Sequence, residues 1–483
     1  MTAALLTEWS RLLLGSLSRA GVEHVVLSPG SRSTPFAWAA LKEPKLTCHS
    51  LSDERVAAFF ALGQARLTGK PSLLLCTSGS AAAHYYPALI EASLARLPVL
   101  VLTADRPFEL QHSGAPQAID QIKLFGDSAR AFFELGAPDS APSALAGLVR
   151  HAAHALKLTQ IPEPGPVHLN VRARKPLEPS AALDADSLAL RKAVDDLLAR
   201  GTTLVEHSIS HADVTRLVDA CRETTRGLIV VGPRPAYTPT ATRALLRLGE
   251  ATGFPLLCES ASQLRFGHEL PSKAARIDGF EWIMSSERQC ERLRPELVLS
   301  FGAPPVSGAY ERFLAEFLGA RFVVAAHGFP DPHGLASELI CADEAAVAER
   351  ISAELERRPA AHAARAPFTL DWLAANADAW RAVDSELRRE TSLLSEPLAI
   401  RRVLEQLPDP CTLVLGNSLP IREVDAYAPC AARRARVLSQ RGANGIDGLI
   451  SGAAGAASLS REPTLLLLGD VSFMHDLGGL AAA

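Results

Sequence analysis

The chain has 483 residues, of which 48% are hydrophobic, and a formal net charge of −4. This length suggests roughly three domains of ~150 residues each, and so small a net charge gives no electrostatic basis for binding nucleic acid or an anionic membrane. The eight cysteines are scattered without a CxxC pair, which favours buried thiols in a reducing cytosol over a disulfide framework or a zinc site. No apolar stretch is long enough to span a bilayer. We therefore expect a cytoplasmic protein with no integral membrane segment and no nucleic-acid partner.

The first part of the chain alternates helices with short apolar strands. A helix is expected over 4–20, and its charged residues Glu8 and Arg11 argue against a signal peptide. Strands are expected over 24–27, 47–49, 72–76, 98–103 and 165–171. Repeated strand–turn–helix units of this kind form a parallel, doubly wound sheet.

Two further α/β parts follow, separated by expected linkers. The linkers are the Pro- and Asp-rich stretch 174–187 and the Ala/Arg/Pro-rich stretch 357–367. The second part has expected strands over 227–231, 255–257, 297–301 and 321–325, and the third over 412–415, 436–438 and 464–468. The leucine run at 465–468 is typical of a fully buried parallel strand. The sequence thus predicts three consecutive doubly wound α/β domains.

Glu54 is a first candidate for chemistry. It lies in the first turn of an apolar helix capped by Ser52 or Asp53, where a carboxylate can simply complement the helix dipole, worth up to ~1 kcal/mol. However, Val56 and Phe59 place it beside an apolar surface. A partly desolvated carboxyl group can share a proton with a ring nitrogen, so a structural and a catalytic role are both open.

Four arginines follow expected strands directly: Arg32, Arg106, Arg422 and Arg441. Parallel sheets bind ligands at the carboxyl ends of their strands, and the arginine fork suits carboxylates. Any one of these arginines is an ordinary surface charge, but four in equivalent positions indicate a substrate with several carboxylates.

Asp470 also ends an expected strand, with Gly469 before it and Ser472 after it. A carboxylate there can cap the next helix, or it can hold a hard cation that binds a diphosphate. The glycine-containing turns 77–80 and 441–448 allow a ligand to approach the backbone closely. Neither turn matches a dinucleotide or P-loop pattern.

Eight motifs stand in order along the chain: SPGSRSTP (28–35), SDER (52–55), TSGSAAAHYYPALIEA (77–92), LTADRP (102–107), GAPQAIDQ (114–121), GNSLPIR (416–422), SQRGANGIDGL (439–449) and GDVSFMHDLGGL (469–480). Together they resemble a known family, the thiamine-diphosphate-dependent 2-succinyl-5-enolpyruvyl-6-hydroxy-3-cyclohexene-1-carboxylate synthases of menaquinone biosynthesis. The resemblance implies a pyrimidine-binding domain over 1–180, a middle domain over 187–356 and a diphosphate-binding domain over 368–483. It also implies a homodimer or homotetramer, with cofactor between the first domain of one subunit and the third of another.

The resemblance further implies how the cofactor is bound. Glu54 corresponds to the glutamate that contacts N1′ of the aminopyrimidine and promotes ylide formation. Ile446 corresponds to the apolar residue that keeps thiamine diphosphate bent, and Asp470 to the first ligand of Mg²⁺ or Mn²⁺. The remaining cofactor positions are Ser418, Gly469 and Ser472.

The implied reaction decarboxylates 2-oxoglutarate and adds the resulting succinyl unit to isochorismate. Positions that handle the succinyl unit correspond to Asn417, Arg422 and Arg441. Positions around isochorismate correspond to Ser31, Arg32, Arg106 and Gln117. These two substrates carry several carboxylates, in keeping with the arginines at strand ends.

The chain departs from the family in three places. His84 replaces the usual Asn, and the stretch 301–313 has Ser307-Gly308 where the family has a Ser-Lys pair that reaches isochorismate. The family also continues beyond GDVSFMHDLGGL into a strand with a second metal ligand. We therefore expect an incomplete third domain, with poor cofactor binding and little activity in the chain as printed.

Two alternatives remain open. One is an acetolactate-synthase-like 2-oxoacid decarboxylase or carboligase, which would have fewer arginines at strand ends and often a flavin in its middle domain. The other is a non-catalytic fragment that lacks the region of the second metal ligand.

Overall fold

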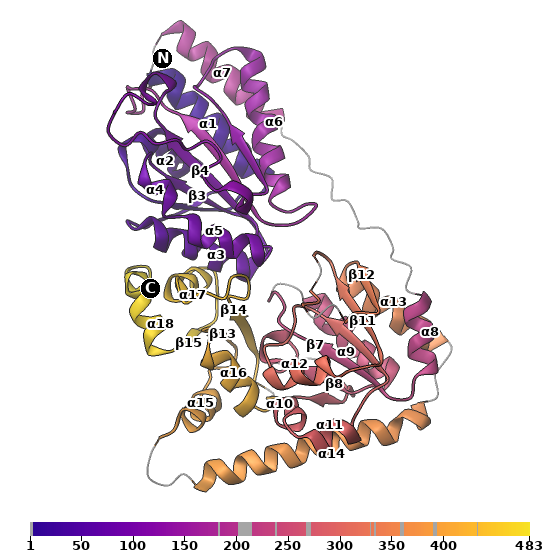
Figure 1. The fold of residues 1–483 in the computed structure, drawn as a ribbon. Helices are drawn as coiled ribbons and strands as arrows, with labels where there is room; N and C mark the ends of the chain where they lie inside the picture. The colour runs from indigo at the N-terminus through magenta and orange to yellow at the C-terminus, as the bar shows by residue number, and fades with distance from the viewer. Residues whose placement is uncertain are drawn as a thin grey trace. The chain divides into compact units, whose positions relative to one another are not determined.

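The protein is described by a computed structural model over residues 3–181, 184–200, 215–236, 239–266, 272–328, 330–332, 335–357, 362–389, 394–431 and 433–483. These residues form three sheets whose paired strands are all parallel, with helices between the strands (Figure 1). The predicted α/β class with three parallel sheets is confirmed. Among the helices in these ranges, none is both long and apolar enough to cross a bilayer.

The chain divides into two compact units, which we describe separately. Unit 1 comprises Met1–Glu206, Gln440–Arg461 and Asp470–Ala483, and unit 2 comprises His207–Ser439 and Glu462–Gly469.

Unit 1 is built on a six-stranded sheet with the order β2-β1-β3-β4-β6-β5. Its strands are β1 (His24–Leu27), β2 (Thr47–Ser50), β3 (Ser72–Cys76), β4 (Val99–Asp105), β5 (Ala131–Glu134) and β6 (Pro166–Arg172). Its helices are α1 (Ala3–Ala20), α2 (Thr34–Lys42), α3 (Glu54–Thr68), α4 (Ser80–Ala83), α5 (Tyr86–Leu94), α6 (Pro142–Leu158), α7 (Ala185–Arg200), α17 (Leu449–Ala457) and α18 (Asp470–His475).

Both faces of this sheet are covered by apolar helices (Figure 1). Helices α1, α2, α6 and α7 pack on one face, where side chains such as Leu13, Leu75 and Leu169 form a core. Helices α3 and α5 cover the other face through Phe59, Leu89 and their neighbours. Burial on both faces explains why the central strands are continuous runs of Leu and Val.

Unit 2 contains the other two sheets. The six-stranded sheet has the order β12-β11-β10-β7-β8-β9, and the three-stranded sheet has the order β14-β13-β15. The strands are β7 (Gly227–Val231), β8 (Leu256–Cys258), β9 (Arg276–Ile277), β10 (Leu297–Phe301), β11 (Ala320–Ala325), β12 (Glu338–Cys341), β13 (Cys411–Leu415), β14 (Ala435–Ser439) and β15 (Thr464–Leu467). The helices are α8 (Thr215–Glu223), α9 (Pro239–Thr252), α10 (Phe280–Met284), α11 (Glu287–Arg292), α12 (Gly308–Ala315), α13 (Glu344–Arg357), α14 (His362–Arg389), α15 (Glu396–Glu405) and α16 (Leu419–Tyr427).

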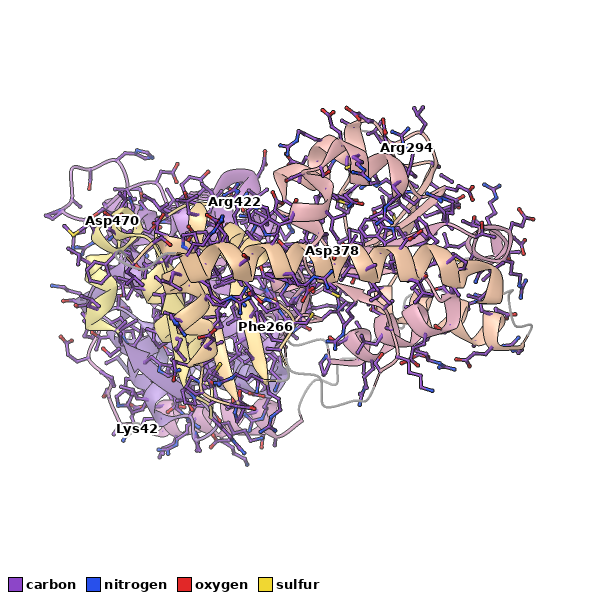
Figure 2. All side chains as sticks on the ribbon, turned by 90° about the horizontal axis from the view of Figure 1, so that it is seen from below. Lys42, Phe266, Arg294, Asp378, Arg422 and Asp470 are labelled. Atoms are coloured by element: carbon purple, nitrogen blue, oxygen red, sulfur yellow. The ribbon has the colours of Figure 1, made fainter. Side chains whose placement is uncertain are left out.

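The prediction of a linker over 357–367 is wrong for residues 357 and 362–367, which are the part of this range that the structure describes. Arg357 ends α13, and residues 362–367 begin the long helix α14, on which Asp378 is labelled in Figure 2. Ala and Arg are strong helix formers. The buried Arg365 also donates to the carbonyl oxygens of Thr224 at 3.0 Å and Thr252 at 2.7 Å, which anchors this helix.

The leucine strand is a second correction. We predicted a fully buried strand, but β15 is half-buried along its length. Among the described strands it pairs with β13 alone, in register from Thr412 with Thr464 to Leu415 with Leu467. As an edge strand of this sheet, it has a neighbour on one side only.

In unit 1, α3 and α17 cross at a distance that only glycine permits. A Cβ atom on Gly63 would lie 1.9 Å from the carbonyl oxygen of Gly452, and one on Gly455 would lie 2.0 Å from that of Phe60. Backbone therefore packs directly against backbone, and this contact fixes the position of both helices.

Substitution at this crossing should be costly. Gly63→Ala places a methyl group against a backbone carbonyl, so we expect it to destabilise the protein by about 1–3 kcal/mol, a typical cost of overpacking. Gly147→Ala on α6 is the control, because the nearest atom to its added methyl group is the end of the Arg150 side chain, 4.0 Å away. It should be neutral or stabilise by up to ~1 kcal/mol. Thermal unfolding of both variants tests this, and an equal midpoint for the two would contradict it.

Candidate active site

Polar turns meet at the carboxyl ends of β1 and β3 in unit 1. Gly30 approaches Thr77 so closely that a Cβ atom would lie 2.3 Å from the Thr77 Cβ. The backbone N–H of Arg32 donates to Thr77 Oγ1 at 3.3 Å. The strand order reverses between these two strands, which is where sheets of this class bind ligands. Ser31 is exposed at this position.

Arg32, Arg106 and Gln117 are brought together here. Arg106 Nη2 donates to Gln117 Oε1 at 3.2 Å. Arg32 is buried and donates to the Ala173 carbonyl oxygen at 2.6 Å; its pKa is lowered, mainly by burial and also by the charge of Arg106. The buried Nε of Arg106 has no hydrogen-bond partner among the described residues. Two neighbouring guanidinium groups with an unused donor suit an anionic ligand.

Glu54 begins α3, as the sequence predicted. Asp53 is its N-cap, and its Oδ1 accepts the N–H of Arg55 at 2.9 Å and of Val56 at 3.3 Å. Glu54 is therefore free of the capping role and remains half-buried.

Buried groups lie near the Glu54 carboxylate. Burial raises the pKa of Cys76 and of Tyr85, and the negative charge of Glu54 adds to both shifts. The carboxylate thus lies beside a weakly hydrated part of the core, as the apolar sequence around it suggested.

The loop 441–448 is held from both ends within unit 1. The buried Glu91 carboxylate accepts the N–H of Gly442 at 3.0 Å and that of Ala443 at 2.5 Å. At the other end, a Cβ atom on Gly448 would lie 1.9 Å from the Phe59 ring. Ile446, half-buried like Arg441, is therefore carried on a loop tied to α5 and α3.

Asp470 begins α18 and is exposed. Its Oδ1 accepts the backbone N–H of Val471 at 2.9 Å. Ser472 is buried, and a Cβ atom on Gly469 would meet no atom within 4 Å. The donor chemistry suits Mg²⁺, which often takes one protein carboxylate together with phosphate oxygens. Within the described residues, no group of three or more potential ligands is gathered as a metal site.

The other predicted residues belong to unit 2, at the carboxyl end of β13. Asn417 is buried, and Ser418, the N-cap residue of α16, adopts a left-handed φ of 71°. Such strained non-glycine positions concentrate at functional sites. The exposed Arg422 donates to the Ser418 carbonyl oxygen at 2.6 Å, which supports this turn.

The sequence reasoning missed a buried polar network beneath Arg106. Arg172 Nη1 lies 3.0 Å from Asp105 Oδ2, and Asn170 Nδ2 donates to the same oxygen at 3.1 Å. Burial raises the pKa of Asp105, while Asn170 and Arg172 offset part of the shift. Asp105 lies within the quoted motif LTADRP, but Asn170 and Arg172 come from β6 and carry no local signal of this role.

His168 is the innermost member of this region. It is fully buried between the rings of Phe125 and Phe132, at centroid distances of 4.7 and 5.1 Å. Its Nε2 lies 2.7 Å from Thr103 Oγ1, and burial lowers its pKa to about 3.

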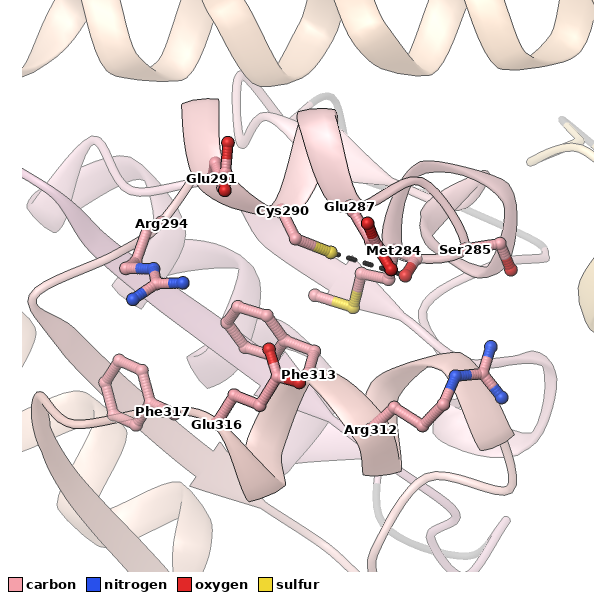
Figure 3. A pocket seen from close by; sticks show the side chains of 10 residues that line it. All are labelled: Met284, Ser285, Glu287, Cys290, Glu291, Arg294, Arg312, Phe313, Glu316 and Phe317. Atoms are coloured by element: carbon pink, nitrogen blue, oxygen red, sulfur yellow. Dashed lines mark hydrogen bonds between the residues drawn. The ribbon is translucent and has the colours of Figure 1, made fainter.

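A separate cavity of 280 Å³ lies in unit 2, with Arg294 and Arg312 at its sides (Figure 3). Its lining is Met284, Ser285, Glu287, Cys290, Glu291, Arg294, Arg312, Phe313, Glu316 and Phe317. Parallel α/β sheets bind ligands at the carboxyl ends of strands, but this cavity is lined from the ends of α10 and α12 and from α11. None of the predicted site residues lines it.

Comparison with known proteins gives two kinds of match. The family model "Thiamine pyrophosphate enzyme, N-terminal TPP binding domain" matches residues 7–124. A 2-succinyl-5-enolpyruvyl-6-hydroxy-3-cyclohexene-1-carboxylate synthase of Sorangium cellulosum is 43% identical over 98% of this chain and 78% of the relative. Synthases of the same name from Natronomonas pharaonis and Bacillus pumilus are 38% and 36% identical, over 99% and 100% of this chain and 81% of each relative.

The buried His168 predicts acid sensitivity. The unfolded chain binds a proton at this residue below pH ~6.5, whereas the native state does so only near its pKa of about 3. The free energy of unfolding should therefore fall as the pH is lowered from 6.5 towards 3, by up to about 1.4 kcal/mol per pH unit.

Unfolding midpoints at pH 7 and pH 5 measure this effect. The difference between the two midpoints should shrink in His168→Gln and remain in His154→Gln, which alters an exposed histidine on α6. An unchanged difference in His168→Gln would contradict the prediction.

Proposed function

Because the chain belongs to the 2-succinyl-5-enolpyruvyl-6-hydroxy-3-cyclohexene-1-carboxylate synthase family, we propose that it decarboxylates 2-oxoglutarate and joins the succinyl unit to isochorismate in menaquinone biosynthesis. The observation that carries this is the 43% identity to a synthase of that name over 98% of the chain. The clustering of Arg32, Arg106 and Gln117 at the strand ends supports it independently.

The arginines would neutralise and orient the carboxylates of the two substrates. We assign Ser31, Arg32, Arg106 and Gln117 to isochorismate, because the unused Nε donor of Arg106 and its neighbouring charge favour a dianion. We assign Asn417, Arg422 and Arg441 to the succinyl unit, by their positions in the family motifs.

The cofactor would be thiamine diphosphate, which when bound supplies the electron sink for decarboxylation. Glu54 would hold and return a proton at the aminopyrimidine ring nitrogen. Ile446 would support the bent cofactor from its anchored loop. Asp470 would bind Mg²⁺ or Mn²⁺ through its exposed carboxylate, and the diphosphate would be held near Ser418, Gly469 and Ser472.

The same proposal includes the domain boundaries, the oligomeric state and the cellular compartment. Each proposed domain, 1–180, 187–356 and 368–483, contains the strands of one sheet. Exposed apolar side chains at Tyr86, Ile90 and Leu94 form a stripe along α5, which supports self-association as a homodimer or homotetramer. The eight free cysteines are in keeping with a cytoplasmic enzyme.

The acetolactate-synthase-like alternative is less well supported. A flavin in the middle domain would need the crevice between β7 and β10, where the strand order reverses. There the nearly buried Arg234 donates to Glu344 Oε2 at 2.9 Å. A Cβ atom on Gly302 would lie 2.9 Å from the Arg234 Cγ. The point where the strand order of this sheet reverses therefore holds an ion pair that packs closely against Gly302.

Isochorismate loss followed by absorbance tests the proposal directly, with 2-oxoglutarate, thiamine diphosphate and Mg²⁺ supplied. We would measure the printed chain and a version extended past Ala483, because the chain covers 78% of the Sorangium relative. Consumption of isochorismate by the extended form, with little by the shorter one, is the expected result. Turnover of pyruvate in its place would favour the acetolactate-type enzyme, and the absence of both cofactor binding and turnover would favour the non-catalytic fragment.

Adjacent carboxylates provide a matched test of Glu54. Glu54→Gln removes the group that shares the proton, so kcat should fall by about 10²–10⁴-fold. Asp53→Asn makes the same chemical change one residue earlier but keeps a good N-cap, and it should retain most activity. Equal losses in the two variants would indicate that the helix start, and not the Glu54 carboxylate, matters.

A further inference from the structure

We propose that Gln121 is a positioning residue that sets the geometry of the Arg106–Gln117 pair and thereby the affinity for isochorismate. This inference rests on the proposed function, since it concerns the side of the site assigned to that substrate. Gln121 itself is completely buried and is not expected to touch either substrate.

The Gln121 amide is held in one orientation by a hydrogen bond at each end. Its Oε1 accepts the backbone N–H of Gly79 at 3.0 Å. Its Nε2 donates to Asn170 Oδ1 at 3.0 Å. The amide therefore joins the turn after β3 to the buried network on β6.

That network continues to the backbone of Arg106. Asn170 Nδ2 donates to Asp105 Oδ2 at 3.1 Å, and Asp105 Oδ1 accepts the N–H of Arg106 at 2.7 Å. The carbonyl oxygen of Arg106 accepts from Arg172 Nη1 at 3.0 Å. Both backbone polar groups of Arg106 are thus tied to the chain of contacts that begins at Gln121.

The other end of the amide supports Gln117. Gly79 and Gln117 both have left-handed φ values, 89° and 55°. A Cβ atom on Gly79 would lie 3.3 Å from the Gln117 Cβ. Gln117 therefore sits directly against the turn that Gln121 holds, and its side chain accepts from Arg106 at 3.2 Å.

Gln121 therefore supports both residues of the Arg106–Gln117 hydrogen bond. Without its amide, the Gly79 N–H and the Asn170 Oδ1 each lose a buried partner, and such losses loosen or distort the surrounding backbone. Gln121 and the partners named above belong to unit 1, whereas Asn417 and Arg422, which we assign to the succinyl unit, belong to unit 2. We therefore expect the handling of 2-oxoglutarate to be little affected. The expected consequence is a selective effect on isochorismate.

The test is Gln121→Met, which keeps the size of the side chain. It removes the hydrogen bonds to Gly79 and Asn170 and a longer one from Nε2 to the Ala104 carbonyl oxygen at 3.5 Å. We expect the KM for isochorismate to rise tenfold or more, while the KM for 2-oxoglutarate changes less than twofold. Gln64→Met is the matched control. Gln64 is also completely buried, and its amide makes two side-chain hydrogen bonds, to Ser72 at 2.9 Å and Ser458 at 3.2 Å. Its loss should lower stability without changing either KM selectively.

Hydrogen–deuterium exchange provides a readout that does not need turnover. Exchange over 77–80 and 106–117 should accelerate in Gln121→Met and stay unchanged in Gln64→Met. If Gln121→Met fails to fold, Gln121→Asn is measured instead. It keeps an amide but shortens the side chain by one methylene group, so it should show the same effects to a smaller degree.

The outcomes separate this inference from the proposed function. Unchanged exchange in the Gln121 variant, or equal rises in both KM values, overturns the positioning role. Failure of the unsubstituted enzyme to consume isochorismate overturns the proposed function, whereas accelerated exchange would still support the bracing of the turn.

Discussion

The close crossing of α3 and α17 is the constraint on which the arrangement of unit 1 depends. Gly63 and Gly455 let two backbones touch where a side chain at either position would separate them. Glu54 stands at the beginning of α3, and the loop 441–448 leads directly into α17. A shift of either helix would therefore move a proposed catalytic group relative to the loop that carries Ile446. Glu91 strengthens this link, because its carboxylate holds the loop to α5 by two backbone hydrogen bonds.

The buried ion pair of Asp105 and Arg172 contributes more to the position of Arg106 than to the stability of the fold. Asp105 and Arg172 are almost completely removed from water, and the desolvation of such a pair offsets much of its attraction. An apolar pair of similar size could stabilise the sheet equally well. Such a pair could not fix the N–H and C=O of Arg106 through directional hydrogen bonds, as Asp105 and Arg172 do. The network makes sense if the exact direction of the Arg106 side chain matters.

The sequence was sufficient for much of the fold because its central strands are short apolar runs. The strands over 24–27, 72–76, 227–231 and 297–301 have the predicted bounds, and both of their faces are buried. Strands β5 and β12 were missed, since they are only partly buried and lack such a run. The helix at 362–367 was mistaken for a linker because its anchor, Arg365, bonds to carbonyl groups more than a hundred residues away in the chain.

In the candidate site, too, local patterns were predictable and contacts between distant residues were not. The motif turns predicted that Arg32 and Arg106 lie at the carboxyl ends of parallel strands. The two charges lie close enough to interact although β3 stands between their strands, β1 and β4. Gln121 lay within a quoted motif, GAPQAIDQ, yet its part could not be inferred. Its partners Gly79 and Asn170 lie 42 and 49 residues away, and no local pattern reports a hydrogen bond across that separation. Periodicity predicts which face of an element is buried, but it does not say which buried polar atoms meet.

The two six-stranded sheets differ in the residues that lie where their strand order reverses. Between β1 and β3, short turns around Gly30 and Thr77 leave the exposed Ser31 at a strand end, and the half-buried Glu54 follows β2. Between β7 and β10, Arg234 and Glu344 neutralise each other, and backbone at Gly232 packs against the Ala303 carbonyl group. A charge that is paired within the protein no longer favours an anionic ligand, whereas the neighbouring cations Arg32 and Arg106 still do. The fold therefore provides several possible sites, and the pairing of their charges decides which one can bind a substrate.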